Sequence, residues 1–479
     1  MTRLLFVASE AYPLIKTGGL ADIAGSLPEV LRQQGVDVRL LLPAYRHILD
    51  SIDRPRTVAE LELAGIPLRI LGTVLPGTGV ETWLLDHPSF AERPGNPYHG
   101  PDGQSWPDNA DRFMLLSRLA AAISTGEAGL DWRPDVLHCN DWHTGPAVAL
   151  TQLREQRPLT VFTVHSLAHM GLFDRATFER LQLPEHFWQD SALEFYNQFS
   201  FIKGGLVYAD YITTVSPNYA REICESPGGL GLEGLLQARR ERLVGILNGI
   251  DHQVWDPASD PYLEHHYNAA NPQGKALEKA ALQRSLGLAV GDDRPLLGIV
   301  GRLVEQKGLE LILPVLGDIL AQSAQLVVLG TGERGYEAQL QAVARAYPDA
   351  MAVVLAYDES LAHRIEAAAD IFLMPSLFEP CGLNQLYSLR YGTLPLVRSV
   401  GGLADTVVDA TPEALAAGTA TGFVFEAPDS GQFMAALERA IALWRDTASW
   451  RQLQATAMAQ DFSWQRSAAR YMELYDSPR

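Results

Sequence analysis

The sequence predicts an α/β protein built from two halves, each with its own parallel sheet. Short apolar runs with little alternation are separated by helical patterns along nearly all of the chain, which is typical of parallel strands buried on both faces. A chain of 479 residues exceeds one ordinary core, so two or three domains are expected. Each half also begins with an apolar run and a glycine turn that carries a lysine, Lys16 in the first half and Lys307 in the second.

The first half begins with a βαβ pattern. Leu4 to Ala8 is predicted as a strand, Leu20 to Gln34 as a helix that ends at Gly35, and Val38 to Leu42 as the next strand. Further strands are predicted at residues 82–85, 136–139, 160–164, 211–215 and 243–247, with helices at 110–123 and 195–207.

The second half continues the alternation after a proline-containing stretch, Asp256 to Gln273, which is predicted to be the linker. Its strands are predicted at residues 296–300, 325–329, 351–356, 371–374, 394–397 and 422–425, and a last helix at 464–475. The predicted domains are therefore 1–250, 251–460 and a terminal helical segment, 461–479.

Composition narrows the class of protein. A hydrophobic content of 47% and a mean hydropathy of −0.02 indicate a soluble globular chain. The first apolar run is too short for a signal peptide or a membrane span. Cys139, Cys224 and Cys381 show no paired spacing, so a reducing cytoplasm is expected. The net charge of −19 disfavours nucleic acid and anionic membranes as partners.

The two glycine turns predict phosphate binding. Only five of the 38 basic residues are lysines, yet each turn carries one. A strand, a glycine turn with a cation and a helix together hold phosphate, because the backbone approaches the anion and the helix N-terminus faces it. Arg302 precedes Lys307 by five residues, so both can reach one phosphate group if the segment between them turns. We therefore expect one anionic substrate between the two domains; the alternative is that these are ordinary surface lysines.

Polar clusters follow two predicted strands, at His138–His143 and at Thr163–Ser166. Ligands of open α/β sheets bind at such carboxyl ends, so these clusters predict part of a site. The alternative for any single histidine is a buried core imidazole. His165 and His169 have a spacing seen in zinc sites, but no further ligand is spaced to complete one, and no metal is predicted.

The segment Phe378–Asn384 predicts a positioned carboxylate. Glu379 lies between Phe378 and Pro380, ahead of a glycine and a helix whose first N–H groups face an anion. The alternative is a glutamate that only stabilises the helix dipole.

Gly330–Gly335 matches the dinucleotide fingerprint and raises the alternative of a nicotinamide-dependent oxidoreductase. It follows the second strand of its half, however, and the next strand-end acid, Asp358, comes later than expected. A structural glycine turn, or one that touches a nucleotide, is the favoured interpretation, and no cofactor is predicted. The sequence also contains no Asp-x-Asp motif for a catalytic cation.

Several long motifs occur along the chain in the same order as in the bacterial glycogen synthase and plant starch synthase family, which the sequence resembles over residues 3 to 475. They are Lys16–Asp22, Asn140–His143, Gly245–Asp251, Gly301–Arg302 with Lys307–Gly308, and Glu379–Leu383. The resemblance implies the GT-B architecture, with two Rossmann-like domains facing across a cleft and a C-terminal helix returning to the first. It also implies metal-independent, retaining transfer of glucose from ADP-glucose to the non-reducing 4-hydroxyl of an α-1,4-glucan such as glycogen.

The resemblance assigns roles residue by residue. Arg302 and Lys307 match the cations on the departing diphosphate, and Glu379 matches the carboxylate beside the sugar. Lys16 matches the loop lysine, and His165 matches the histidine at the sugar 6-hydroxyl. The other matched positions, which line the substrates, are Gly18, Gly19, Tyr98, Asp141, Asn248, Tyr357, Cys381, Gly382, Leu383 and Asn384.

Some positions depart from the family pattern. Ser166, Asn384 and Ala356 stand where relatives often have Asn, Thr and Gly, respectively. Tyr387 occupies the place of a second glutamate that is common in the wider group of retaining transferases, which favours the starch synthase branch. A catalytically silent glucan-binding protein of the same fold is a further alternative, which the full set of charged site residues disfavours.

Overall fold

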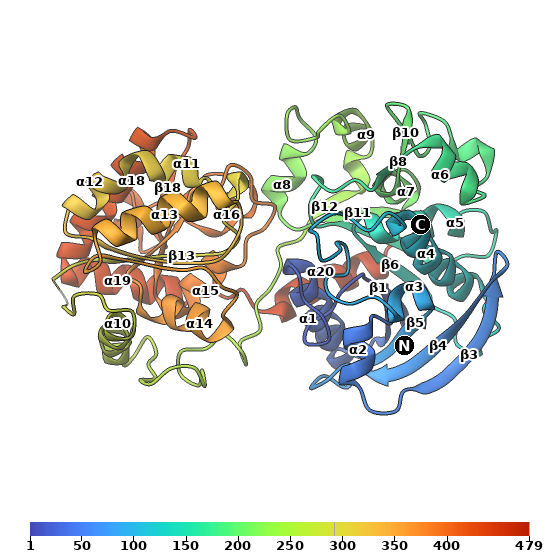
Figure 1. Ribbon diagram of the computed structural model, residues 1–479, viewed down its shortest axis with the longest axis horizontal. Coiled ribbons are helices and arrows are strands. Elements are labelled where there is room, and N and C mark those ends of the chain that lie inside the picture. The colour runs from blue at the N-terminus through green and yellow to red at the C-terminus, as the bar shows by residue number, and fades with distance from the viewer. Residues whose placement is uncertain (292, 479) are drawn as a thin grey trace. The chain divides into compact units, whose positions relative to one another are not determined.

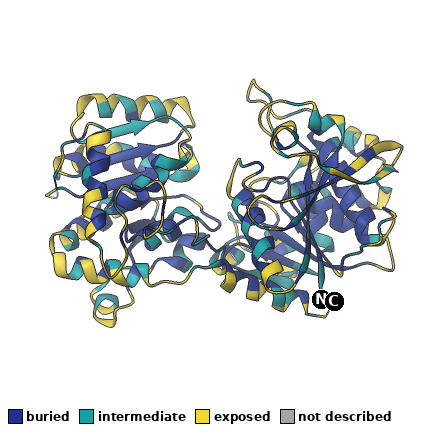
Figure 2. Ribbon diagram, turned by 90° about the horizontal axis from the view of Figure 1, so that it is seen from below, coloured by how far each residue is buried: buried dark blue, intermediate teal, exposed yellow. Residues whose placement is uncertain are grey.

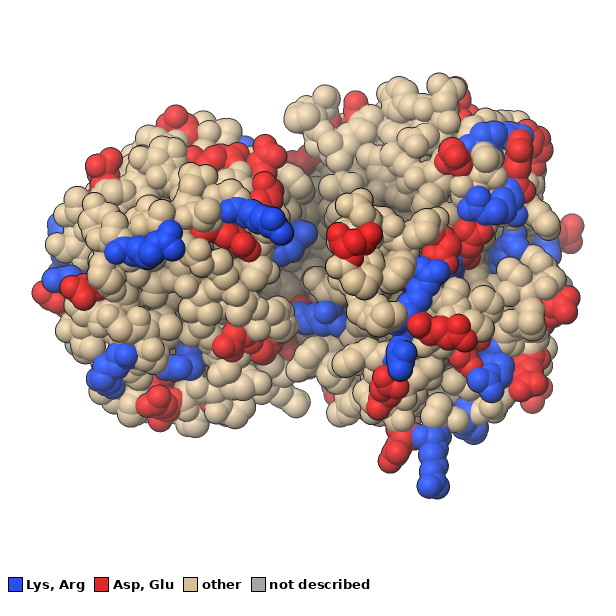
Figure 3. All heavy atoms as spheres, in the orientation of Figure 1, with Lys and Arg blue, Asp and Glu red and all other residues tan. Residues whose placement is uncertain are grey.

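The structure is a computed structural model that describes residues 1–291 and 293–478 and divides into two compact α/β units (Figure 1). The first unit contains Met1–Gly249 together with the C-terminal residues from Trp464, and the second contains Ile250–Ser463. Among the described residues, none of the helices is long and apolar enough to cross a membrane. On the face drawn in Figure 3, basic and acidic side chains are interspersed over each unit.

The first unit is built on a nine-stranded sheet in the order β12-β11-β7-β6-β1-β2-β5-β4-β3. The strands from β12 to β5 run parallel, whereas β3 and β4 are antiparallel to their neighbours. The bounds are β1 (Arg3–Val7), β2 (Asp37–Pro43), β3 (Arg56–Leu63), β4 (Ile66–Val74), β5 (Glu81–Asp86), β6 (Val136–Asn140), β7 (Leu159–Val164), β11 (Tyr211–Thr214) and β12 (Leu243–Gly245).

Helices of the first unit follow its strands. Helix α1 begins right after Gly18, whose backbone is extended, and α4 ends at Gly126, which has a φ of 85°. The bounds are α1 (Gly19–Gln33), α2 (Arg46–Ser51), α3 (Pro88–Ala91), α4 (Asn109–Thr125), α5 (Gly145–Thr151), α6 (Arg175–Arg180), α7 (Phe201–Tyr208), α8 (Pro217–Glu222), α9 (Glu233–Ala238) and α20 (Trp464–Tyr475).

The predicted helix 195–207 is wrong in its first part. Residues 194–200 form β9 (Glu194–Phe195) and β10 (Gln198–Ser200), which pair with β8 (Leu172–Phe173) in a small antiparallel sheet. Tyr196 and Asn197 turn the chain with φ values of 50° and 63°, which a helix does not allow. The helix therefore begins only at Phe201. Sequence analysis also missed the β3–β4 hairpin.

Helix α20 belongs to the first unit, although it follows the second in sequence. The Tyr475 hydroxyl lies 2.8 Å from His138 Nδ1, and Ser467 Oγ donates to the Leu247 carbonyl at 2.6 Å. His138 and Tyr475 are buried, so the last helix is anchored in the core beside β6.

The second unit has a six-stranded parallel sheet in the order β15-β14-β13-β16-β17-β18. Side chains of β14 alternate between two apolar clusters: Leu326 and Val328 join one, and Val327 and Leu329 the other. Both faces are thus covered, as the dark strands of Figure 2 show. The strands are β13 (Leu296–Val300), β14 (Gln325–Leu329), β15 (Met351–Val354), β16 (Ile371–Met374), β17 (Leu394–Arg398) and β18 (Phe423–Phe425).

The helices that cover this sheet are mostly short. They are α10 (Gln273–Ser285), α11 (Leu309–Ile312), α12 (Leu316–Ala321), α13 (Arg334–Ala346), α14 (Glu359–Ala368), α15 (Asn384–Tyr391), α16 (Gly401–Thr406), α17 (Pro412–Ala417), α18 (Ser430–Arg445) and α19 (Thr447–Met458).

The predicted linker, Asp256 to Gln273, is wrong, because this stretch packs inside the second unit. Asp260 is fully buried, accepts a hydrogen bond from the Tyr391 hydroxyl at 2.5 Å and lies 2.7 Å from His363 Nδ1. Trp255 stacks against the His363 ring with the centroids 3.7 Å apart. The units divide earlier, between Gly249 and Ile250.

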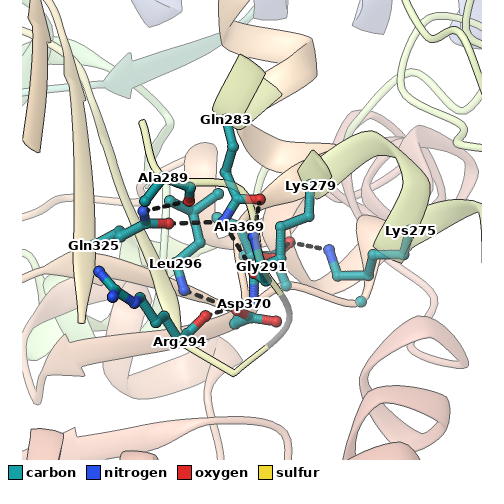
Figure 4. A network of polar contacts seen from close by, with 12 residues as sticks. Lys275, Lys279, Gln283, Ala289, Gly291, Arg294, Leu296, Gln325, Ala369 and Asp370 are labelled. Atoms are coloured by element: carbon teal, nitrogen blue, oxygen red, sulfur yellow. Dashed lines mark hydrogen bonds and ion pairs between the residues drawn. The ribbon is translucent and has the colours of Figure 1, made fainter. Parts of the chain in front are cut away.

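A buried polar network joins α10 to the amino ends of β13 and β14 (Figure 4). Lys279 Nζ donates to Asp370 Oδ2 at 2.8 Å and to the Arg294 carbonyl at 2.6 Å. The same Asp370 oxygen accepts from the Leu296 N–H at 2.8 Å. Because the Lys279 side chain is only 5% exposed, this carboxylate is the counter-charge that stabilises its buried ammonium.

We expect Asp370→Asn to destabilise the second unit by about 3 kcal/mol, because it leaves the Lys279 ammonium buried without a counter-charge. Urea unfolding of the full chain measures this. Glu473→Gln, which breaks an exposed pair with Arg470, is the control and should leave the unfolding midpoint nearly unchanged. Equal midpoints for the two variants would contradict the role given to Asp370.

Candidate active site

Polar residues lie at the carboxyl ends of three adjacent strands in the first unit. Glu10 follows β1, Asp141 follows β6 and His165 follows β7. These strands are parallel neighbours in the sheet, so their ends meet at one edge. The structure therefore brings together the two predicted clusters and adds Glu10, which sequence analysis did not single out.

Asp141 occupies a strained backbone conformation, with φ 57° and ψ 179°. Its Oδ1 accepts the His165 N–H at 2.8 Å, and its own N–H donates to the Thr163 carbonyl at 2.9 Å. Burial raises the pKa of the Asp141 carboxyl to about 7. Strain and a shifted pKa at a strand end are typical of functional sites.

His165 and Asn248 each have a buried acceptor atom for which the described residues provide no hydrogen-bond partner. Burial lowers the pKa of His165 to about 3, so the ring is neutral near pH 7. Its Nε2 lies 2.9 Å from Asn140 Oδ1 and therefore carries the proton, which makes Nδ1 an acceptor. His165 Nδ1 and Asn248 Oδ1 are both buried without a hydrogen-bond partner among the described residues. Buried acceptors without a protein partner are usually satisfied by an ordered water or by a ligand donor such as a hydroxyl.

The Lys16 turn is held by two carboxylates. Lys16 Nζ pairs with Asp22 Oδ1 at 2.8 Å. Glu10 Oε2 accepts from the N–H of Thr17 at 2.5 Å and from its hydroxyl at 2.7 Å. Gly18 then leads directly into α1, whose first N–H groups lack helical acceptors.

Tyr98 lies in the same part of the first unit. Its hydroxyl is 2.8 Å from Ser9 Oγ, and its ring stacks on His143 with the centroids 4.9 Å apart. Ser9 Oγ also lies 3.3 Å from His143 Nδ1. Ser9 was not predicted, because one serine after a strand is a weak signal.

In the second unit, Lys307 and Glu379 form an ion pair. Lys307 Nζ lies 2.6 Å from Glu379 Oε2, which also accepts from Ser376 Oγ at 3.0 Å. The Lys307 side chain is 28% exposed and that of Glu379 only 9%. The Gln306 amide donates to the Phe378 carbonyl at 3.1 Å and ties together the segments that carry the pair.

Arg302 is exposed after β13, and its Nη2 lies 3.5 Å from Gln306 Oε1. Asn384 opens α15 and donates from Nδ2 to the Val300 carbonyl at 2.7 Å, so this helix start faces the end of β13. Leu383 is the N-cap of that helix, and Gly382 before it has a φ of 74°.

Tyr357 and Cys381 lie at opposite extremes of burial. Tyr357 is 76% exposed and its hydroxyl donates to Glu359 Oε2 at 2.8 Å, whereas Cys381 is buried. A flat, exposed ring suits stacking on a base, while a buried thiol acts through packing.

Gly330 and Gly332 hold the loop after β14 against the loop after β13. A Cβ at Gly330 would lie 1.8 Å from the Gly301 carbonyl, and one at Gly332 would lie 2.2 Å from the Leu303 carbonyl. Leu303 also pairs with Thr331 and Glu333 through backbone hydrogen bonds. These contacts favour the structural interpretation of the Gly330–Gly335 turn.

The zinc alternative gains no support from the described part of the chain. Across residues 1–291 and 293–478, no group of three or more His, Cys, Asp or Glu side chains could hold a metal ion.

Comparison with known proteins gives one consistent family. The family described as "Starch synthase catalytic domain" matches residues 3–238, and "Glycosyl transferases group 1" matches residues 287–454. The chain is 53% identical to Glycogen synthase 1 of Methylococcus capsulatus, covering 99% of this chain and 96% of that one. It is 53% identical to the glycogen synthase of Cellvibrio japonicus, with 99% of both chains covered.

A solved structure agrees with these relatives. The catalytic domain of starch synthase IV from Arabidopsis thaliana, bound to ADP and acarbose, matches with a TM-score of 0.88 and 32% identity over 99% of this chain and 98% of that chain. Sucrose-phosphate synthase from Thermosynechococcus elongatus shares the fold, with a TM-score of 0.60 at 17% identity. The predicted GT-B fold and family are confirmed.

We expect Asp141→Asn to change how stability depends on pH. The carboxyl has a pKa of about 7 when folded and about 3.9 when unfolded, so between these values the folded state binds the extra proton. The unfolding free energy of the wild type should therefore fall as pH rises from 4 to 7, relative to that of the variant. Urea unfolding of both proteins at pH 5 and 7.5 measures this, and parallel pH dependences would contradict the burial assigned to Asp141.

Proposed function

The chain belongs to the glycogen and starch synthase family of glycosyltransferases, and we propose that it works as a glycogen synthase. It transfers glucose from ADP-glucose to the non-reducing 4-hydroxyl of an α-1,4-glucan, with retention of configuration. Full-length identity of about half to proteins named glycogen synthase carries this conclusion. The Lys307–Glu379 pair at the strand ends of the second unit supplies the two charges that such a transfer requires.

We assign the diphosphate of the donor to the second unit. Arg302 and Lys307 provide cations there, and the N–H groups of Leu383 and Asn384 at the start of α15 provide neutral donors. The exposed ring of Tyr357 is assigned to the adenine. Cys381 and Gly382 directly precede Leu383, and we assign them to the backbone that leads into this helix start.

We assign the sugar and the acceptor to the first unit. The unpaired acceptors His165 Nδ1 and Asn248 Oδ1 suit sugar hydroxyls, and Asp141 fixes His165 through its backbone. Tyr98 is assigned to the acceptor side. Lys16 and the backbone N–H groups of Gly18 and Gly19 are assigned to the donor phosphate, where they add one positive charge and neutral donors.

The chemistry is charge stabilisation at both ends of one breaking bond. As the glycosidic bond to phosphate lengthens, negative charge grows on the ADP oxygens and positive charge on the sugar. Lys307 and Arg302 stabilise the first, and the Glu379 carboxylate stabilises the second. In a front-face route the departing phosphate takes the proton of the acceptor hydroxyl, and transfer on that face retains the configuration and requires no enzymic nucleophile; a covalent role for Glu379 is the alternative.

The partners and the compartment follow from this role. The donor is a nucleotide sugar and the acceptor an α-glucan, and neither nucleic acid nor membrane is assigned. The three cysteines, Cys139, Cys224 and Cys381, are free thiols, which supports a place in the reducing cytoplasm.

A donor panel tests the function. ADP-, UDP- and GDP-glucose are each supplied with glycogen in the presence of EDTA, and both nucleoside diphosphate release and glucan elongation are measured. We expect elongation with ADP-glucose that persists under chelation. Absence of elongation with every donor would leave a silent glucan-binding protein. In parallel titrations with NADH and with ADP, NADH binding without ADP binding would favour the oxidoreductase.

We expect Lys307→Ala and Arg302→Ala each to lower kcat by about 10² to 10³, because each removes a preorganised charge from the departing ADP. Initial rates at saturating donor measure the effect, and thermal melts check the fold. Arg345→Ala, which removes an exposed arginine from the last turn of α13, is the matched control and should keep wild-type kcat. A change confined to the donor KM would contradict the assigned role.

We expect Glu379→Gln to abolish nearly all transfer while ADP still binds, because glutamine keeps the shape but loses the charge that faces the sugar. Initial rates beside calorimetric ADP titration separate the two effects. Glu413→Gln, which removes an acid from the first turn of α17, controls for a helix-dipole role. A Glu379→Gln enzyme with more than about a tenth of wild-type kcat would contradict the catalytic role.

A further inference from the structure

Two carboxylates of the first unit bind a threonine in the same way, at opposite ends of the sheet. Glu10 Oε2 accepts from the N–H and the hydroxyl of Thr17 at 2.5 and 2.7 Å. Asp210 Oδ2 accepts from the N–H and the hydroxyl of Thr160, both at 2.8 Å. Asp210 lies just before β11, whereas Glu10 lies beyond the carboxyl end of β1, on the edge that carries the candidate site.

These two carboxylate–threonine contacts, called clamps below, differ in whether a cation is paired with the carboxylate. Arg157 binds both oxygens of Asp210, at 2.6 and 2.9 Å. Glu10 is 3% exposed, and in the described part of the chain no lysine, arginine or histidine forms an ion pair with it. Burial raises the pKa of Glu10. A buried carboxylate without a cation costs stability, and such costs are typical of residues kept for function.

The segment that Glu10 holds is the lysine turn. Thr17 stands between Lys16 and Gly18, so fixing its N–H and its hydroxyl fixes the main chain on both sides. Lys16 Nζ reaches Asp22 at 2.8 Å on one side, and on the other Gly18 leads into α1. The Tyr98 hydroxyl also hydrogen-bonds Thr17 and Glu10, so Glu10 is the charged anchor of a turn that Tyr98 helps to hold.

We propose that Glu10 is a positioning residue: it fixes Thr17 and thereby holds Lys16 and the glycine N–H groups in the geometry that binds the diphosphate of the donor. This inference rests on the proposed function of Lys16. Glu10 itself touches neither phosphate nor sugar in this role.

A double-mutant cycle tests the proposal with ADP as the probe. Glu10→Gln, Lys16→Ala and the double variant are titrated with ADP by calorimetry in the full-length protein. We expect Glu10→Gln to weaken ADP binding about 10-fold, because glutamine keeps an acceptor oxygen but replaces two hydrogen bonds to a charged group with weaker neutral ones. In the Lys16→Ala background the same substitution should weaken it by less than about threefold, because its target is already gone.

The chain offers matched controls. Asp210→Asn breaks the equivalent clamp at the other end of the sheet, so it should lower the unfolding midpoint and leave ADP affinity within about twofold of wild type. Thr17→Ser keeps both hydrogen bonds and should bind ADP normally, whereas Thr17→Val loses one of them and should bind it more weakly. If Glu10→Gln reduces the yield of folded protein, the comparison of ADP affinity between Thr17→Ser and Thr17→Val tests the proposal instead.

Three results would overturn the proposal: wild-type ADP affinity in Glu10→Gln, an undiminished Glu10 effect in the Lys16→Ala background, or an equal loss of ADP affinity in Asp210→Asn. If Lys16→Ala itself bound ADP and turned over like the wild type, the proposed role of Lys16 would fail first, and the positioning role with it. A normal Glu10→Gln beside a defective Lys16→Ala would overturn the positioning role alone.

Discussion

Parallel strands covered on both faces leave mainly their ends for polar chemistry, and this constraint determines where most of the candidate site residues lie. In the second unit, β14 sends alternate side chains into two apolar clusters, so no polar group on that strand can face solvent from either side. Charged groups therefore gather where strands stop, as Glu10, Asp141 and His165 do in the first unit. Burial at those ends is also what shifts the pKa of Asp141 upward and that of His165 downward.

The same constraint explains the glycines of the second unit. When ligand-binding loops leave adjacent strand ends, their backbones must pass each other closely. A Cβ at Gly308 would lie 2.0 Å from the Pro375 carbonyl, and one at Gly401 would lie 2.0 Å from the Glu379 carbonyl. Any side chain at these positions would push apart the segments that carry Lys307 and Glu379. The glycine-rich sequence near the site thus reflects backbone packing at least as much as contact with phosphate.

Much of this arrangement could be predicted from the sequence, and the failures have physical causes. Buried parallel strands give strong apolar runs, so β13, β14 and β16 lie where the sequence placed them. The β3–β4 hairpin has an exposed face and a mixed pattern, which gives a weaker signal. The stretch 256–272 lacks regular structure but is held by the buried Asp260, whose partners His363 and Tyr391 are more than 100 residues away in sequence. Periodicity cannot report such contacts.

The site shows the same division between local signals and tertiary ones. Lys307 and Glu379 could be singled out from their neighbours in sequence, but their mutual ion pair could not, because it joins segments after two different strands. Glu10 and Ser9 were missed because a single polar residue after a strand is a weak signal; their partners Thr17 and Tyr98 reveal them only in the folded chain. The strained backbone of Asp141 could not be predicted from the sequence, because its φ of 57° and ψ of 179° lie in a region that glycine normally occupies.

Both lysines assigned to phosphate are already paired with a carboxylate, Lys16 with Asp22 and Lys307 with Glu379. Each lysine side chain keeps about a quarter of its surface exposed, at 24% and 28%, so the pair orients the ammonium without hiding it. In the proposed reaction this has a further consequence for the second pair. We propose that, as negative charge grows on the departing phosphate, the Lys307 ammonium moves toward it and away from Glu379. The carboxylate is then left to interact with the positive charge that grows on the sugar at the same moment. One ion pair thus divides into two separate interactions along the reaction, and both are stronger in the transition state than in the ground state, which is the condition for catalysis.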